Sequence, residues 1–115
     1  MPTDATGRLA ADRADTRARI ETMTREYGNI VAASADANTD DEHDPEGATI
    51  AFERAQLSAL LDQARRHLDD LVLASGRVAA GTYARCESCG GAISPERLAA
   101  RPVARTCIGC ARSQR

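Results

Sequence analysis

The sequence is poor in aromatic side chains and contains no lysine. Its 115 residues include no tryptophan, one phenylalanine and two tyrosines, and all 15 basic side chains are arginine. So few aromatic residues cannot fill a large core. We therefore expect a mainly α, extended molecule that buries Leu, Ile, Val and Ala in a narrow seam. The length is that of one small domain.

Long hydrophobic runs are also absent. No apolar stretch approaches the roughly 20 residues of a membrane-spanning helix, and the N-terminus lacks the apolar core of a signal peptide. We therefore expect a cytoplasmic protein with no membrane partner. Because the cytosol keeps thiols reduced, the four cysteines are better explained as metal ligands than as disulfides.

The net charge is only -2, but acidic and basic side chains gather in different segments. Residues 36–46 hold six acidic residues and no arginine, whereas residues 77–115 hold seven arginines and two glutamates. Two interpretations are open. Both segments are ordinary solvated surface, or the molecule has an acidic working end and a basic docking end.

A long helix is predicted to begin at Pro45. Asp44 can cap the first backbone N–H groups, and Pro45 at the first helical position has no donor to leave unpaired. Seam positions then recur at spacings of four and three, and Gly81 is a plausible stop. These positions are Ile50, Arg54, Leu57, Leu61, Ala64, Leu68, Leu71, Ser75 and Val78.

A weaker repeat of the same kind precedes it. Its positions are Leu9, Arg13, Thr16, Ile20, Met23, Tyr27 and Ile30. Folding the chain about residue 40 aligns the two repeats, which predicts an antiparallel two-helix coiled-coil hairpin over residues 1–81 with an acidic tip at about 36–48. The aligned pairs are Leu9 with Leu71, Thr16 with Ala64, Met23 with Leu57, and Ile30 with Ile50. The alternative, a helix pair within a compact bundle, would need further helices.

The cysteines form two C-x2-C pairs, Cys86 with Cys89 and Cys107 with Cys110, separated by seventeen residues. This spacing is typical of a structural zinc site. One tight turn can present two thiolates to a tetrahedral ion, and four protein ligands leave no coordination position open for catalysis. We predict one structural Zn2+ in a small module over residues 82–115. Redox C-x-x-C motifs are disfavoured, because no thioredoxin-like strand–helix pattern surrounds them.

Residues 44–110 resemble the DksA/TraR family of bacterial RNA polymerase regulators, which carry a C4-type zinc finger. The C-E-S-C-G run from Cys86 to Gly90 and the A-R-P-V-A-R-T-C-I-G-C run from Ala100 to Cys110 carry the resemblance. It implies a transcription regulator that is not an enzyme. The coiled coil would enter the polymerase secondary channel, with the acidic tip near the active site and the zinc globule at the rim.

The resemblance also implies roles for single residues. The family's tip motif, D-x-x-D-x-A, is matched here by Asp44-Pro45-Glu46-Gly47-Ala48, with Glu in place of Asp and a spacing shorter by one residue. Asp44, Glu46 and Ala48 are therefore the expected effector residues. In the arginine-rich base, Arg97 and Arg101 are expected to dock on the polymerase.

One family feature is expected to be missing. The family's pocket for the alarmone ppGpp uses basic residues at positions that are Asp70 and Ala111 here. Because only Arg101 of that group is retained, we expect this pocket not to be retained.

Two rival functions remain open. Tip carboxylates including Asp40, Asp41 and Asp44 suit a transcript-cleavage factor that holds a second Mg2+ in the polymerase site. The arginines of the base suit a zinc-ribbon nucleic-acid-binding protein. Direct DNA binding is not expected, because only Tyr83 accompanies those arginines and the isoelectric point is about 5.6.

Overall fold

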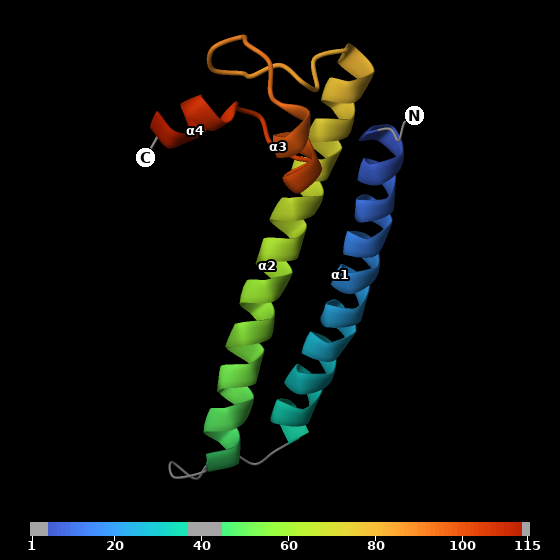
Figure 1. Cartoon of the computed structure of the whole chain (residues 1–115). Helices are drawn as coiled ribbons and strands as arrows, with labels where there is room; N and C mark the ends of the chain where they lie inside the picture. The colour runs from blue at the N-terminus through green and yellow to red at the C-terminus, as the bar shows by residue number, and fades with distance from the viewer. Residues whose placement is uncertain (1–4, 37–44, 114–115) are drawn as a thin grey trace. The chain divides into compact units, whose positions relative to one another are not determined.

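A computed structural model of the chain describes residues 5–36 and 45–113. Within them, helices follow in the order α1 (Ala5–Asp36), α2 (Pro45–Ala80), α3 (Pro95–Ala100) and α4 (Ile108–Ser113) (Figure 1). These residues form no strand, only an isolated antiparallel bridge between Arg85 and Ala92. The predicted mainly α fold is confirmed. No helix in these two ranges is long and apolar enough to cross a membrane.

The residues at each end of α2 explain where the helix begins and where it stops. The helix begins at Pro45, as predicted, while the expected cap Asp44 lies outside the described residues. At the other end Gly81 has a positive φ of 79°, a conformation that glycine adopts without steric cost. The Gly81 N–H donates to the Val78 carbonyl (3.1 Å) and the Thr82 N–H to the Arg77 carbonyl (2.9 Å). This pair of bonds closes the helix in a Schellman motif, so Gly81 is the stop.

Contacts divide the chain into two compact units. We call Thr16–His67 the arm unit, and Met1–Asp15 together with Leu68–Arg115 the base unit, each considered over its described residues. The boundary predicted at residue 81 separates the long helices from the cysteine module instead. That these two parts are separate domains stays a prediction.

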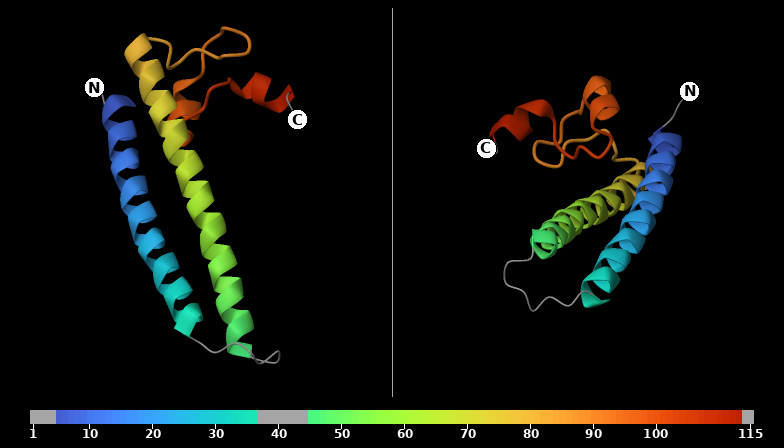
Figure 2. Two further views of the ribbon diagram at one scale, coloured as in Figure 1. Left: turned by 180° about the vertical axis from the view of Figure 1, so that it is seen from behind. Right: turned by 90° about the horizontal axis from the view of Figure 1, so that it is seen from below.

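The arm unit consists of antiparallel parts of α1 and α2 lying side by side (Figures 1 and 2). Thr16 is fully buried, and Leu61 and Ala64 are 5% exposed. The remaining predicted seam positions of this unit are buried or half-buried as well. The face that each helix turns toward its partner is therefore the predicted one.

The predicted layers at Ile30 and Met23 stay predictions. Ile30 was expected opposite Ile50, and it lines a groove with Leu57. Met23 was expected opposite Leu57, and it lines a groove with Leu60. Residues that line one groove lie near each other without being paired across the seam. Since seam residues recur every three or four positions, two registers one turn apart bury nearly the same faces, and the pattern alone does not separate them.

The base unit holds the most deeply buried part of the hairpin. Leu9, Leu71 and Ala74 form one cluster at 1%, 0% and 0% exposure, against which Tyr83 and Val103 of the cysteine module pack. The predicted pairing of Leu9 with Leu71 is confirmed. Full burial of a leucine contributes about 1.5–3 kcal/mol, so this cluster anchors the module to the helices.

Polar seam positions of the base unit also meet. The Arg13 guanidinium donates from Nη1 to Ser75 Oγ at 3.3 Å, and Ser75 Oγ donates to the Leu71 carbonyl at 2.9 Å. A half-buried polar pair loses its partners if the helices slide, so it favours one alignment of the two helices.

Candidate metal centre

The first cysteine pair lies on a tight turn that glycine makes possible. The Cys86 N–H donates to the Gly91 carbonyl (2.7 Å) and the Gly90 N–H to the Cys86 carbonyl (3.0 Å). Gly90 has a φ of 77°. A Cβ on Gly91 would lie 3.3 Å from Cys89 Sγ. Both glycines therefore let the backbone fold closely around the two sulfurs.

The second pair lies at the start of α4. Cys107 precedes the helix and Cys110 belongs to it, and the Ala111 N–H donates to the Cys107 carbonyl at 2.9 Å. The Glu87 N–H donates to the Arg105 carbonyl at 2.9 Å, which ties the two cysteine turns together. Local backbone bonds thus position all four thiols.

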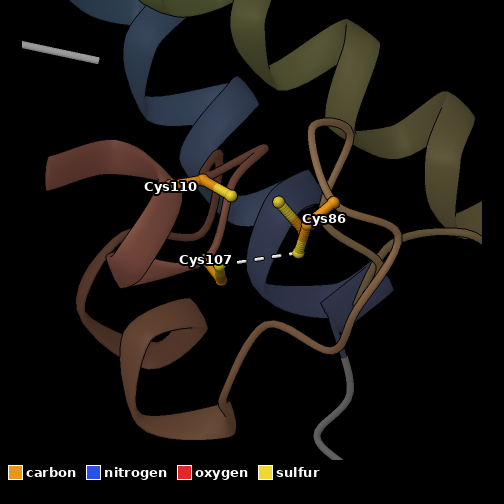
Figure 3. Close-up of side chains that lie close together, drawn as sticks. Cys86, Cys107 and Cys110 are labelled. Carbon is orange, nitrogen blue, oxygen red and sulfur yellow. Dashed lines mark hydrogen bonds between the residues drawn. The ribbon is translucent and has the colours of Figure 1, made fainter. Parts of the chain in front are cut away.

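All four predicted ligands come together. Their sulfur atoms lie within 4.8 Å of one another, and Cys89 Sγ lies 3.9 Å from Cys107 Sγ. Figure 3 shows the side chains of Cys86, Cys107 and Cys110 turned toward one another. Zn–S bonds of about 2.3 Å in a tetrahedron place sulfurs roughly 3.8 Å apart. The donor set therefore fits one structural zinc ion.

Hydrogen bonding among the four thiols agrees with this assignment. Backbone N–H groups of Cys107 and Cys89 donate to the sulfur of Cys86 and lower the pKa of this thiol to about 6. Hydrogen bonds to the sulfurs of Cys107, Cys86 and Cys89 raise the pKa of Cys110 to about 12. Four sulfurs this close cannot all be thiolates without a cation to neutralise them, and zinc supplies that charge.

The module has only a small apolar core of its own. Ile93, Leu98 and Ala104 are buried around Cys86. Ser94 caps the short helix α3, since its Oγ accepts from the Arg97 N–H at 3.1 Å. A core this small contributes little stability, so bound metal is expected to stabilise the module substantially.

Beside the module's core lies a basic hollow. It has a volume of about 300 Å3 and includes both predicted docking residues, Arg97 and Arg101, together with Arg105. The Arg97 Nε donates to the Thr106 carbonyl at 2.7 Å, so Arg97 holds the module together as well as carrying charge. Arg101 is exposed, which makes it the better candidate for docking.

The positions compared with the family's alarmone pocket lie in this same hollow. Asp70 and Ala111 line it together with Arg101. Sequence comparison counted one retained cation, whereas the hollow also contains Arg97 and Arg105. The helix α3 ends at Ala100, so the arginines at 101 and 105 follow no helical repeat, and the sequence contains no periodic signal that groups them with Arg97.

Arg77 was missed as a site residue. Its side chain is 13% exposed, and its Nη2 donates to the carbonyls of Val103 and Ala104, both at 3.5 Å. Nη1 lies 3.9 Å from a Glu87 carboxylate oxygen, and Arg105 Nε lies 3.8 Å from the other oxygen. An arginine in the last turn of a helix resembles ordinary surface charge, so the sequence offered no signal for this role.

The predicted tip is described only in part. Asp44, like Asp40 and Asp41, lies outside the described residues. Glu46 belongs to the first turn of α2, and Ala48, two residues further on, is exposed. Sequence analysis overlooked Phe52 near this end of α2, because it lies outside the seam repeat. It is the chain's single phenylalanine and is 67% exposed.

Comparisons with known proteins match both the cysteine module and the fold of the described chain. Residues 81–114 match the prokaryotic dksA/traR C4-type zinc finger family. The structure matches that of transcription factor DksA2 from Pseudomonas aeruginosa with a TM-score of 0.80 and 26% sequence identity, over 96% of this chain and 79% of that one. No curated protein matches the sequence. The resemblance to the DksA/TraR family is thereby confirmed.

Proposed function

We propose that this chain regulates transcription by binding bacterial RNA polymerase in the cytosol. The hairpin enters the secondary channel, the acidic tip acts near the active site, and the zinc module stays at the rim. The observation that carries the proposal is the match to the DksA2 transcription factor, which extends over 96% of the chain and so includes both the hairpin and the cysteine module.

The zinc module supports a binding role and not catalysis. Cys86, Cys89, Cys107 and Cys110 supply four ligands, and a zinc ion held by four protein ligands has no open position for a substrate or water. When bound, the metal supplies folding energy to a module whose apolar core is small. The role of these residues is to hold a stable docking surface.

The described residues offer a basis for docking. Arg101 is exposed in a hollow that it shares with Arg97 and Arg105, and guanidinium groups bind carboxylates with directional, charge-assisted hydrogen bonds. The proposed partner surface at the polymerase rim is therefore acidic. Binding by the base and regulation by the tip are then separable properties.

Two substitutions test this separation. Glu46→Asn removes a tip carboxylate and leaves the helix start at Pro45 intact, so it should leave polymerase binding nearly unchanged and strongly reduce the effect on transcription. Arg101→Ala should weaken binding first. Competition binding to core polymerase and single-round transcription at saturating occupancy would be measured on the same proteins. A Glu46→Asn protein that regulates like the parent would refute the tip mechanism.

Arg85→Ala provides the matched control for Arg101→Ala. Arg85 is an exposed arginine of the same module that does not line the hollow, so its loss changes the net charge equally. If both variants bind polymerase equally weakly, general charge attraction explains docking and the hollow does not.

The rival functions predict different measurements. A nucleic-acid-binding protein would shift DNA or RNA in a gel with a steep dependence on salt concentration, because phosphate contacts release counterions. A cleavage factor would shorten the transcript of a backtracked polymerase complex in the presence of Mg2+. Polymerase binding with neither effect supports the regulator.

A further inference from the structure

The arm unit carries an open, partly apolar groove between α1 and α2. Two adjoining hollows of about 560 Å3 and 460 Å3 share Leu60 as a lining residue. Met23 lies in the first hollow, and Ile30 and Leu57 lie in the second. We call these two hollows together the arm groove. Leu60 is 46% exposed and is shared by both hollows, so it gives the groove an apolar centre.

The two ends of the arm groove carry different kinds of ionisable side chain. Glu53 lines one hollow and His67 the other, each seven residues from Leu60. At about 1.5 Å per residue, both lie roughly 10.5 Å from Leu60 along α2 and on the same face. On α1, Glu26 lines the same hollow as Glu53, and Arg19 lines the same hollow as His67. The acidic end of the groove thus holds two carboxylates, and the basic end holds the guanidinium of Arg19 beside the imidazole of His67.

Such a surface is complementary to itself. Rotation by 180° about an axis that crosses the groove at Leu60 brings the acidic end of one copy over the basic end of the other. Glu53 then faces the second His67, Arg19 faces the second Glu26, and the two Leu60 side chains meet at the axis. Isologous contacts of this kind are the commonest interface in homo-oligomers.

We propose that the arm groove binds a second copy of this chain, with the two arms antiparallel. Four helix segments then surround the apolar strip around Leu60, and the charged ends pair between the copies. A helix from an unrelated protein would cover the apolar strip equally well, but nothing would require it to carry the opposite charge order.

The size of the groove makes this interaction weak. From Glu53 to His67 it is about 21 Å long, and two helices side by side are about 20 Å wide. Such a face buries on the order of 400 Å2 per copy, or about 800 Å2 in total, which is less than the roughly 1,200 Å2 of stable interfaces. Self-association should therefore depend on concentration and become measurable toward the upper micromolar range.

Charge exchange between Arg19 and Glu26 gives a specific test. In the proposed dimer, position 19 of one copy faces position 26 of the other at two symmetric places. The Arg19→Glu variant therefore places two carboxylates opposite each other at both places, and the Glu26→Arg variant places two guanidinium groups opposite each other. Neither variant should self-associate. A mixture of the two pairs opposite charges at both places, so it should form a heterodimer. Arg19 and Glu26 are seven positions apart on α1, whereas side chains pair along a helix only at spacings of three or four. The substitutions therefore break no ion pair between these two residues within one chain.

Sedimentation equilibrium from about 10 µM to about 1 mM would follow the mass, which is 12.2 kDa for one chain. The parent and the mixture should rise toward twice that value, and each variant alone should remain near it. Added salt should weaken association of the parent, because the pairs are exposed. A parent that stays monomeric at about 1 mM, or a mixture that behaves like its separate components, overturns the proposal.

Leu60→Arg and Leu73→Arg complete the test as a matched pair. Both leucines are exposed on α2, at 46% and 54%, but Leu73 belongs to the base unit and does not line the groove. Leu60→Arg should abolish self-association, and Leu73→Arg should leave it unchanged. Equal loss in both would assign the association to general hydrophobic contact and refute the groove. All these measurements use the chain without polymerase, so their failure would leave the proposed function untouched.

Discussion

At the residue scale, Gly91 and Gly109 lie at different distances from the cysteine sulfurs, and the difference can be tested by substitution. Gly91→Ala places a Cβ at 3.3 Å from Cys89 Sγ, closer than most real Cβ contacts, so the sulfur must shift by a few tenths of an ångström. We expect zinc affinity to fall several-fold, because the ligands must reach tetrahedral geometry together. Competition with a chromogenic chelator of known affinity measures this loss.

Gly109→Ala is the control for this change. A Cβ on Gly109 would lie 4.0 Å from Cys107 Sγ, an ordinary contact, and Gly109 belongs to helix α4, where alanine is favoured over glycine. Zinc affinity should therefore stay the same or rise. If both alanine variants bind zinc equally well, the close approach of Gly91 to the sulfur does not constrain the site.

At the scale of elements, two neighbouring leucines of α2 in the arm unit differ sharply in burial. Leu61 is 5% exposed, whereas Leu60 is 46% exposed. Leu61→Ala removes a buried side chain and should cost about 2–5 kcal/mol of unfolding free energy, while Leu60→Ala should cost well under half of that. Urea unfolding followed by circular dichroism measures both. Equal losses would mean that α2 turns a different face toward α1.

The same helices mark how far the sequence could predict the structure. Heptad spacing identified the buried faces, because only a period near 3.5 keeps Leu61, Ala64 and Leu71 on one side. Spacing alone does not fix the register at Met23 and Ile30, because moving one helix by a turn exchanges one seam residue for another at little cost. Register depends on the detailed fit of side chains across the seam, which spacing does not record.

The metal site was more fully predictable than its surroundings. A C-x2-C pair is local chemistry, and the turns at Cys86 and Cys107 need only nearby glycines and backbone bonds. Arg77 is different, because its partners at Val103 and Ala104 are more than twenty residues away along the chain. Which carbonyls it reaches depends on how the module folds back, and no local pattern contains that information.

At the scale of the whole molecule, zinc binding should be coupled to pH. In the metal-free protein the pKa of Cys110 is about 12, so this thiol is protonated at neutral pH and must lose its proton to bind zinc. The pKa of Cys86 is about 6, so it adds a second competing proton as the pH falls through that value. Affinity is therefore highest in alkaline solution and should decline steeply below about pH 6.

Calorimetry would count these protons. Zinc titrations at neutral pH in two buffers with different ionisation enthalpies should give different apparent heats, and the difference measures the number of protons released. We expect at least one proton per zinc ion. Equal heats in the two buffers would show that all four cysteines are already thiolates, contrary to the hydrogen bonding around Cys110.

The placement of the two tyrosines has a practical consequence for spectroscopy. Tyr27 belongs to the arm unit and Tyr83 to the base unit, where its hydroxyl donates to the Pro102 carbonyl at 2.6 Å. Since the chain has no tryptophan to mask tyrosine emission, each Tyr→Phe substitution leaves a single fluorophore in one unit. The intrinsic fluorescence of the two variants can therefore record the melting of the arm and of the base separately, without an attached dye.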